Sequence, residues 1–134
     1  MDKLRFRRAT VADLQVIVAM LADDVLGSSR ESASPAVAEC YRTALAEIDA
    51  DPNQFLCVVE DGPEIVGTLQ LSFIPGLARA GAKRGQIEAV RIASDRRDEK
   101  LGEAMFAWAI DECRTRGCSL VQLTTDKARP NAHR

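Results

Sequence analysis

The sequence predicts a mixed α/β fold, in which helices flank one central sheet that holds both parallel and antiparallel strands. Two observations carry this prediction. The dipeptide Asp61-Gly62 separates two apolar, β-branched runs, which is typical of an antiparallel hairpin. Further along, a helical repeat of apolar residues lies between two strand-like runs. Such a strand–helix–strand unit is expected to form a parallel, right-handed crossover.

The first third of the chain predicts one strand and two helices. Apolar and basic residues alternate from Leu4 to Arg8, which indicates a short strand with one dry face. A helix then begins at Thr10, because Thr10 and Asp13 form a near capping box ahead of apolar residues at helical spacing. A second helix begins at Ser34, which is followed by proline, and ends at Asp51, which precedes another proline.

Three strands are predicted in the middle of the chain. They cover Gln54 to Glu60, Glu64 to Ile74 and Gln86 to Ala93. Gly67 lies inside the second of them and indicates a bulge or a close backbone approach. The residues from Pro75 to Lys83 are rich in glycine, alanine and arginine, so we expect a loop there.

The last predicted elements are a helix and a strand. The helix runs from Leu101 to about Arg116 and has one apolar face, and Gly117 ends it. The strand covers Ser119 to Thr125. The 134 residues suffice for one core, so we expect a single domain over residues 1–134.

Composition and charge exclude several classes of protein. A formal net charge of −2 does not provide the basic field with which a nucleic-acid-binding protein meets phosphates. One histidine and four widely spaced cysteines form no zinc or redox motif, so we expect buried thiols and no metal. No apolar run approaches the length of a membrane span, and residues 1–10 are charged. We therefore expect a cytoplasmic protein with no membrane partner.

The stretch from Ile87 to Gly102 carries the clearest chemical signal. It is a strand, a charged turn and a helix start, and a helix N-terminus binds anions through unpaired backbone N–H groups. Arg96, Arg97 and Lys100 add cations for a phosphate. The alternative is a solvated connector whose charges merely lie on the surface.

The stretch from Glu88 to Met105 resembles the main cofactor motif of the GNAT acetyltransferase superfamily. In that family a strand leads into Arg/Gln-x-x-Gly-x-Gly/Ala and then into a helix, and the matching positions here are Arg97 to Gly102. The opening from Arg7 to Asp13 is similar to the family's first strand and helix. The resemblance covers essentially the whole chain and implies a GNAT-like sheet flanked by helices, in the order β-α-α-β-β-β-α-β.

The resemblance implies transfer of an acetyl group from acetyl-CoA to a primary amine of a small molecule or a peptide. Backbone groups of Val90 to Ile92 would bind the pantetheine arm, and Glu88 is the candidate base; its alternative role is a plain carboxylate on a strand face. The implied cofactor-binding residues are Val90, Arg91, Ile92, Arg97, Asp98, Glu99, Lys100, Leu101 and Gly102.

The chain departs from the family pattern at three places. Lys100 stands where the family has its first glycine, and a side chain there is expected to crowd the backbone approach. Asp98 and Glu99 bring negative charge beside the phosphate. The chain ends at Arg134, so the last two strands of the family are missing and the domain is expected to be incomplete at its C-terminus, or a fragment of a longer product.

The departures leave a second function open. This alternative is a catalytically inactive GNAT-like module that binds CoA weakly or only mediates protein association. The missing strands would also leave residues 119–125 as an unpaired edge, which predicts a homo-oligomer formed through that edge. Arg79, Lys83 and Arg84, which precede the cofactor strand, are either solvated or placed to meet an acidic substrate or the CoA 3′-phosphate.

Overall fold

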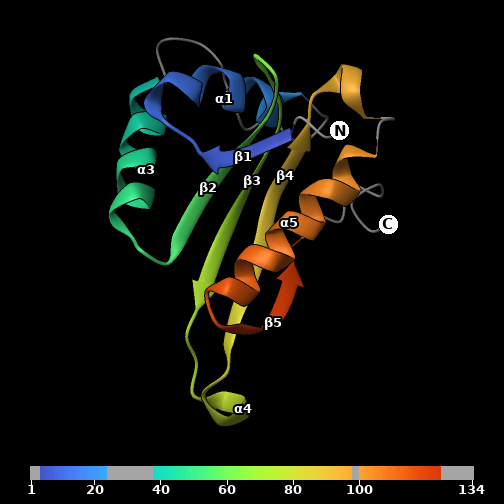
Figure 1. Ribbon diagram of the computed structural model, residues 1–134. Helices are drawn as coiled ribbons and strands as arrows, with labels where there is room; N and C mark the ends of the chain where they lie inside the picture. The colour runs from blue at the N-terminus through green and yellow to red at the C-terminus, as the bar shows by residue number, and fades with distance from the viewer. Residues whose placement is uncertain (1–3, 24–37, 98–99, 125–134) are drawn as a thin grey trace.

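The computed structural model describes residues 4–23, 38–97 and 100–124 (Figure 1). The strands are β1 (Leu4–Arg8), β2 (Gln54–Asp61), β3 (Glu64–Ile74), β4 (Lys83–Ile92) and β5 (Cys118–Leu123). The helices are α1 (Leu14–Ala22), α3 (Ala38–Ala50), α4 (Ala78–Gly81) and α5 (Leu101–Thr115), with 3-10 turns η1 (Val11–Asp13) and η3 (Ser94–Arg96). Along the described chain this is the predicted order of elements, apart from the short turns.

The five strands form one sheet in the order β1-β2-β3-β4-β5. The first three pairings are antiparallel, and β4 pairs with β5 in parallel. The predicted hairpin is therefore confirmed between β2 and β3, and the predicted parallel unit is confirmed across α5. The mixed α/β class follows directly from these pairings.

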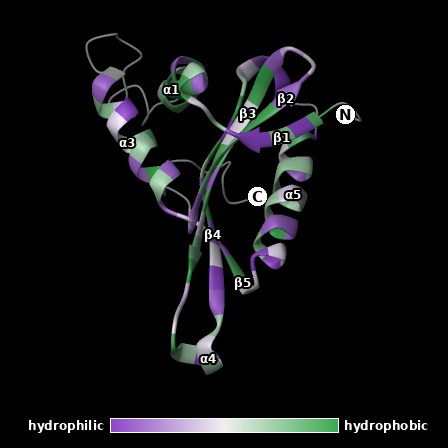
Figure 2. Cartoon of the chain, turned by 60° about the vertical axis from the view of Figure 1, so that its left-hand side comes forward, coloured by the Kyte–Doolittle hydropathy of each residue, from purple (hydrophilic) through white to green (hydrophobic). Residues whose placement is uncertain are grey.

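The sheet separates two layers of helices, as Figure 2 shows, with α5 on one face and α1 and α3 on the other. The main core lies under α5. Alternate residues of β3 and β4 point into it, because successive side chains of a strand point to opposite faces. Its most buried members include Leu69, Leu71, Ile87 and Met105. This face is closed by packing, so any open polar site has to use the other face or an edge.

Glycine at position 67 lets α5 approach the sheet. A Cβ there would lie 2.8 Å from the Sδ atom of Met105, which is closer than side chains pack. The register between β2 and β3 also shifts next to it, between Val59 and Glu60. Both features that the isolated glycine predicted, a bulge and a close approach, are thus present.

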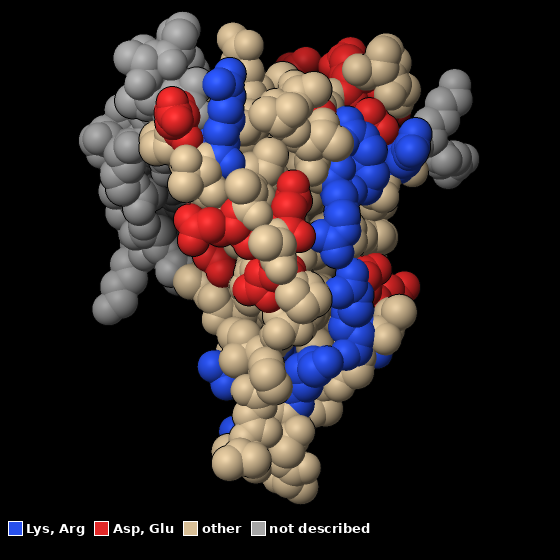
Figure 3. Space-filling model, turned by 90° about the vertical axis from the view of Figure 1, so that its left-hand side faces the viewer, with Lys and Arg blue, Asp and Glu red and all other residues tan. Residues whose placement is uncertain are grey.

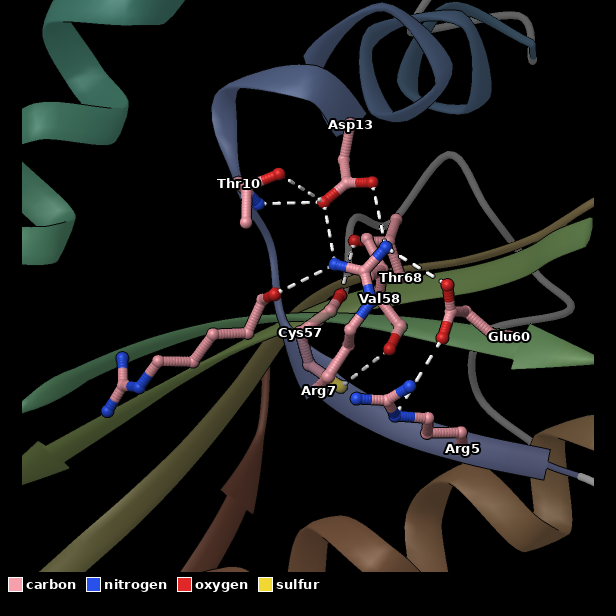
Figure 4. Close-up of polar contacts among 9 residues, drawn as sticks. Arg5, Arg7, Thr10, Asp13, Cys57, Val58, Glu60 and Thr68 are labelled. Carbon is pink, nitrogen blue, oxygen red and sulfur yellow. Dashed lines mark hydrogen bonds and ion pairs between the residues drawn. The ribbon is translucent and has the colours of Figure 1, made fainter. Parts of the chain in front are cut away.

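The predicted capping box at the start of the first helical segment is confirmed (Figure 4). The backbone N–H of Thr10 donates to the Asp13 carboxylate at 2.7 Å, and Arg7 donates to both oxygens of that carboxylate at 2.8 and 3.0 Å. Arg7 also donates to Glu60 at 3.1 Å. One buried carboxylate therefore ties β1 and η1 to each other and, through Arg7, to β2.

Some predicted boundaries shift in the structure. Strand β4 begins at Lys83 rather than Gln86, because its first residues pair with the start of β5, and α4 interrupts the expected loop. The expectation of buried thiols is wrong for Cys40 of α3, which is exposed, and holds for Cys57, Cys113 and Cys118. Within the described residues, no helix has both the length and the apolar character needed to span a membrane.

Candidate functional site

A β-bulge interrupts β4 in the middle of the sheet. Thr68 of β3 lies opposite Arg91 and Gln70 lies opposite Glu88, so Ala89 and Val90 together face a single residue of β3. Ala89 takes the extra step with a φ of 54°, in the left-handed region that alanine rarely adopts. Such strain costs energy and is concentrated at functional sites, and a bulge redirects the side chains beyond it.

Strands β4 and β5 diverge just before this bulge. Their pairing extends only to Ile87 and Leu123, and the N–H of Thr124 donates to the Ile87 carbonyl at 3.0 Å. From Glu88 to Ile92, β4 is paired with β3 alone among the described residues. The other edge of this segment therefore presents backbone groups that no described strand takes up.

Glu88 lies immediately before the bulge, on the face of the sheet opposite α5. Gln86 and Glu88 share that face, since the Nε2 atom of Gln86 donates to a carboxylate oxygen of Glu88 at 3.2 Å. Ile87 between them points into the core under α5. The structure thus places the candidate base beside both the bulge and the point of divergence, in a half-buried position.

The start of α5 lies against the end of β4. Leu101 is buried, and a Cβ at Gly102 would lie 3.5 Å from the Cδ1 atom of Ile92. Lys100 precedes the helix with φ 57° and ψ 19°, a left-handed conformation that glycine adopts without strain. Lys100 therefore adopts a backbone conformation that favours glycine and carries its side chain in addition.

The first backbone N–H groups of α5 have no acceptor within the helix, and the helix dipole makes this end positive. Because Ile92 and Gly102 are in contact, this donor cluster lies at the end of the half-paired segment of β4. The half-paired edge of β4 and the start of α5 are therefore adjacent in the structure.

The neighbouring cations are less available than the sequence suggested. Arg96 donates to Asp61 at 2.6 Å and to Glu64 at 3.2 Å, so it is held at the β2–β3 hairpin. Arg97 reaches Asp23 at 3.4 Å, an exposed contact that stabilises little, and also the Ile92 carbonyl. Asp98 and Glu99 lie outside the described residues.

Arg91 shares β4 with Glu88, beyond the bulge. Its guanidinium group donates to the Val90 carbonyl at 3.0 Å. The structure therefore brings Glu88, Val90, Arg91 and Ile92 together on β4 and sets Leu101 and Gly102 beside them. Among the described residues no group of histidine, cysteine and acidic side chains is placed to hold a metal ion.

Two features of the site were not predicted from the sequence. One is the bulge, for which an Ala-Val pair gives no signal. The other is a polar row on the Glu88 face: Gln54 accepts from Gln70 at 2.9 Å and from Ser72 at 3.1 Å, and Gln86 is in register with Ser72. The alternation of polar and apolar residues from Thr68 to Phe73 of β3 is the sequence signal that marks this row.

Acidic and basic side chains lie side by side on the surface that carries α3. Figure 3 shows Lys and Arg in a column along one edge of this view, with Asp and Glu gathered beside them. The column is therefore bordered by opposite charge, and this view shows no basic field that extends over the whole face.

Comparison with known proteins matches the chain to acetyltransferases. A family model described as the Acetyltransferase (GNAT) family matches residues 22–134. Aminoalkylphosphonate N-acetyltransferase of Salmonella typhimurium is 30% identical over 96 residues, which are 72% of this chain. The matched region spans 62% of that relative's length.

Two solved structures resemble the whole described fold. A transcriptional regulator from Bacillus halodurans C-125 is 45% identical with a TM-score of 0.91, over 97% of this chain and 87% of that one. Glucosamine-6-phosphate N-acetyltransferase from Arabidopsis thaliana is 23% identical with a TM-score of 0.75, over 92% of this chain and 82% of that one. The second likeness shows the fold alone.

Proposed function

Because the chain belongs to the Acetyltransferase (GNAT) family, whose members use acetyl-CoA, we propose that it transfers an acetyl group from acetyl-CoA to a primary amine of a small molecule or peptide. One observation carries this proposal. The half-paired edge of β4 runs from Glu88, directly before the bulge, to Ile92, against which the start of α5 lies. The inactive-module alternative is not favoured by any of these features.

The residues present suit a long anionic thioester. Backbone N–H groups from Lys100 to Gly102 would hold the pyrophosphate at the positive end of α5. The half-paired edge from Val90 to Ile92, together with Arg91, would hold the pantetheine arm by strand-like hydrogen bonds. Arg97 would add a cation after leaving its weak contact with Asp23. We include Asp98 and Glu99 in this turn on sequence grounds alone.

Acetyl-CoA supplies the activated acetyl group as a thioester when it is bound. The amine nitrogen forms a bond to the acetyl carbonyl carbon, the carbon–sulfur bond breaks, and coenzyme A leaves as a thiolate, which takes up a proton from solvent. In our proposal Glu88 takes the proton that the amine gives up, because an amine nucleophile must be uncharged to react. The strained bulge at Ala89 would aim a backbone N–H at the carbonyl oxygen, where negative charge develops.

Substitution of the base tests this assignment. We expect Glu88→Gln to lower turnover by about 10²–10⁴-fold, the usual contribution of a general base, while the affinity for acetyl-CoA stays unchanged. Glu47→Gln, on the exposed surface of α3, is the matched control and should retain full turnover. Unchanged turnover in Glu88→Gln would remove Glu88 from the mechanism.

The acceptor is proposed from aminoalkylphosphonate N-acetyltransferase, the relative that is 30% identical over 96 residues. A short aminoalkylphosphonate is therefore the first amine to offer, followed by amino sugars and peptide amines. The assay detects the acetylated amine by mass spectrometry. Failure to acetylate any of these amines, in a protein that binds acetyl-CoA, would contradict the transferase assignment.

We also propose a homo-oligomer that forms through β5. Val121 and Leu123 are 38% and 43% exposed on this strand, which lies at the end of the described sheet. An apolar strand edge favours pairing with a second copy. Light scattering should report a dimer or larger species that Val121→Lys dissociates; a monomer at high concentration would contradict the proposal.

The four cysteines form no disulfide, which suits the cytoplasmic location that we propose.

A further inference from the structure

Arg84 differs from the other half-buried arginines of the described chain. Arg7, Arg96 and Arg116 each form an ion pair with a carboxylate, at 2.8, 2.6 and 2.9 Å respectively. Arg91 has hydrogen-bonding partners. Arg84 is also half-buried, yet no described residue engages its guanidinium group in a hydrogen bond, an ion pair or a ring contact. Withdrawing a charge from water without a partner is unfavourable, so this position is suited to an anion from outside the chain.

Arg84 lies on the same face of β4 as the proposed base. The register is regular between them: Arg84, Gln86 and Glu88 pair with Ile74, Ser72 and Gln70. Because side chains alternate along a strand, all three β4 side chains point away from α5. Arg84 and Glu88 are thus a fixed cation and a fixed anion on one row, with Gln86 between them.

The sheet surface between the Arg84 and Glu88 side chains, which we call the floor, is polar. Gln54 accepts hydrogen bonds from Gln70 and Ser72, and Gln86 donates to Glu88. These amide and hydroxyl groups already bond one another and Glu88, so they are satisfied without a ligand. The floor therefore requires no hydrogen-bonding groups between the two ends of an acceptor, and the two charges at its ends select the ligand.

The spacing sets the length of the acceptor. Four residues of strand separate the Cα atoms of Arg84 and Glu88, which is about 13 Å at about 3.3 Å per residue. Both side chains leave the same face of the strand, so their charged ends are separated by a distance of this order, and a hydrogen bond at each end shortens the span that the acceptor has to cover. That distance corresponds to a chain of a few methylene groups between the two functional groups.

We infer that the acceptor is a short amine that carries an anionic group, with Arg84 binding the anion while Glu88 faces the amine. This inference rests on the proposed function, since Glu88 is the proposed base. It assigns Arg84 as a specificity-determining residue and gives the acceptor class as aliphatic amino acids, phosphonates or sulfonates with the amine distant from the acid.

A pair of amines of matched length tests the inference. They are 4-aminobutanoate, which ends in a carboxylate, and 4-amino-1-butanol, which ends in a hydroxyl. We expect the wild type to favour 4-aminobutanoate in kcat/KM. Arg84→Gln should lower kcat/KM for 4-aminobutanoate by about 10–100-fold, chiefly through KM, because one charge-assisted hydrogen bond contributes about 1.5–3 kcal/mol. The value for 4-amino-1-butanol should not change.

Two further variants separate specificity from folding. Arg84→Lys keeps the charge but not the planar fork, so we expect an intermediate KM for 4-aminobutanoate. Arg114→Gln removes the same charge from an exposed position on α5 and should behave as the wild type with both amines. Circular dichroism on each variant verifies that the fold is kept.

A binding measurement keeps the inference testable if turnover fails. Chemical shift titration of the ¹⁵N-labelled chain with 4-aminobutanoate should show binding that Arg84→Gln weakens at least tenfold. Equal affinity in the two proteins, or no preference of the wild type for the anionic amine, would overturn the inference. An enzyme that acetylates both amines equally would contradict this acceptor class and leave the acetyltransferase proposal standing. Binding that depends on Arg84 without acetylation would support the anion site and contradict the transferase.

Discussion

Replacement of Asp13 by asparagine removes the negative charge from the centre of the network in Figure 4. The Asp13 carboxylate is 5% exposed and accepts from the Arg7 guanidinium and the Thr10 backbone. An asparagine keeps one acceptor oxygen but turns an N–H₂ group toward Arg7. The variant therefore sets two donors against each other and leaves part of the Arg7 charge unpaired.

The size of the effect follows from the burial of the two partners. Breaking a fully buried ion pair from one side costs about 3–5 kcal/mol. The Arg7 side chain is 25% exposed and retains Glu60 at 3.1 Å, so solvent and the second carboxylate offset part of that cost. We expect Asp13→Asn to lower the free energy of unfolding by about 2 kcal/mol, which corresponds to a fall in Tm of about 8 °C for a chain of this length.

The pH dependence gives the sharper test. Hydrogen bonding from Arg7 holds the pKa of Asp13 below its ordinary value in the folded state. A lowered folded pKa stabilises the protein above the unfolded pKa of about 3.9, and this stabilisation is lost as the pH falls from there through the folded pKa. The gap in unfolding free energy between wild type and Asp13→Asn should thus be constant near neutrality and should narrow in acid.

Urea unfolding followed by circular dichroism at a series of pH values measures this gap. Asp49→Asn, on the exposed surface of α3, is the control and should lie within about 0.5 kcal/mol of wild type. A gap that stays the same from neutral pH to pH 3, or an Asp13→Asn variant as stable as wild type at pH 7, would refute the reasoning.

Three other changes have defined outcomes. Gly85→Ala should lower the free energy of unfolding by about 1–3 kcal/mol, because the new methyl group would overlap the Sγ atom of Cys113. Adding Cys113→Ala to this variant should restore part of the lost stability. If the effects of the two substitutions simply add, the overlap is contradicted. Lys100→Gly should raise the free energy of unfolding by about 0.5–1 kcal/mol, because relief of the left-handed strain exceeds the entropy cost of glycine, and a destabilised variant in thermal unfolding would contradict it. At pH 8 a thiol reagent should modify only the exposed Cys40 in the native chain, and all four cysteines in denaturant. The reason is that burial raises the pKa of Cys57 to about 12 and the pKa of Cys113 to about 11. Rapid labelling of more than one thiol in the native chain would contradict the packing.

Local patterns in the sequence were enough to predict the sheet. The turn at Asp61-Gly62 depends on neighbouring residues alone, and Gly62 indeed has a φ of 62°. The capping pair of Thr10 and Asp13 acts over three residues and was equally visible. Gly117, predicted as the end of the long helix, has a φ of 86°. In each case the side chain type itself favours the observed backbone.

The decisive geometry of the site was not visible in this way. Ala89 adopts a positive φ against its own preference, because β4 has one residue more than β3 over the paired segment. The start of β4 at Lys83 is likewise set by the distant strand β5. The assignment of Glu88 and of the helix start depended on the resemblance to a family, and the partner of each charged residue required the folded chain.

The binding of acetyl-CoA to this chain tests the central claim most directly. Isothermal titration calorimetry should show micromolar binding to the wild type and to Gly102→Ala, whose added methyl group meets only ordinary contact with Ile92. Gly102→Glu should abolish binding, because its carboxylate would stand at the helix start where the pyrophosphate belongs. No binding by the wild type, or equal binding by Gly102→Glu, would contradict the account of this site.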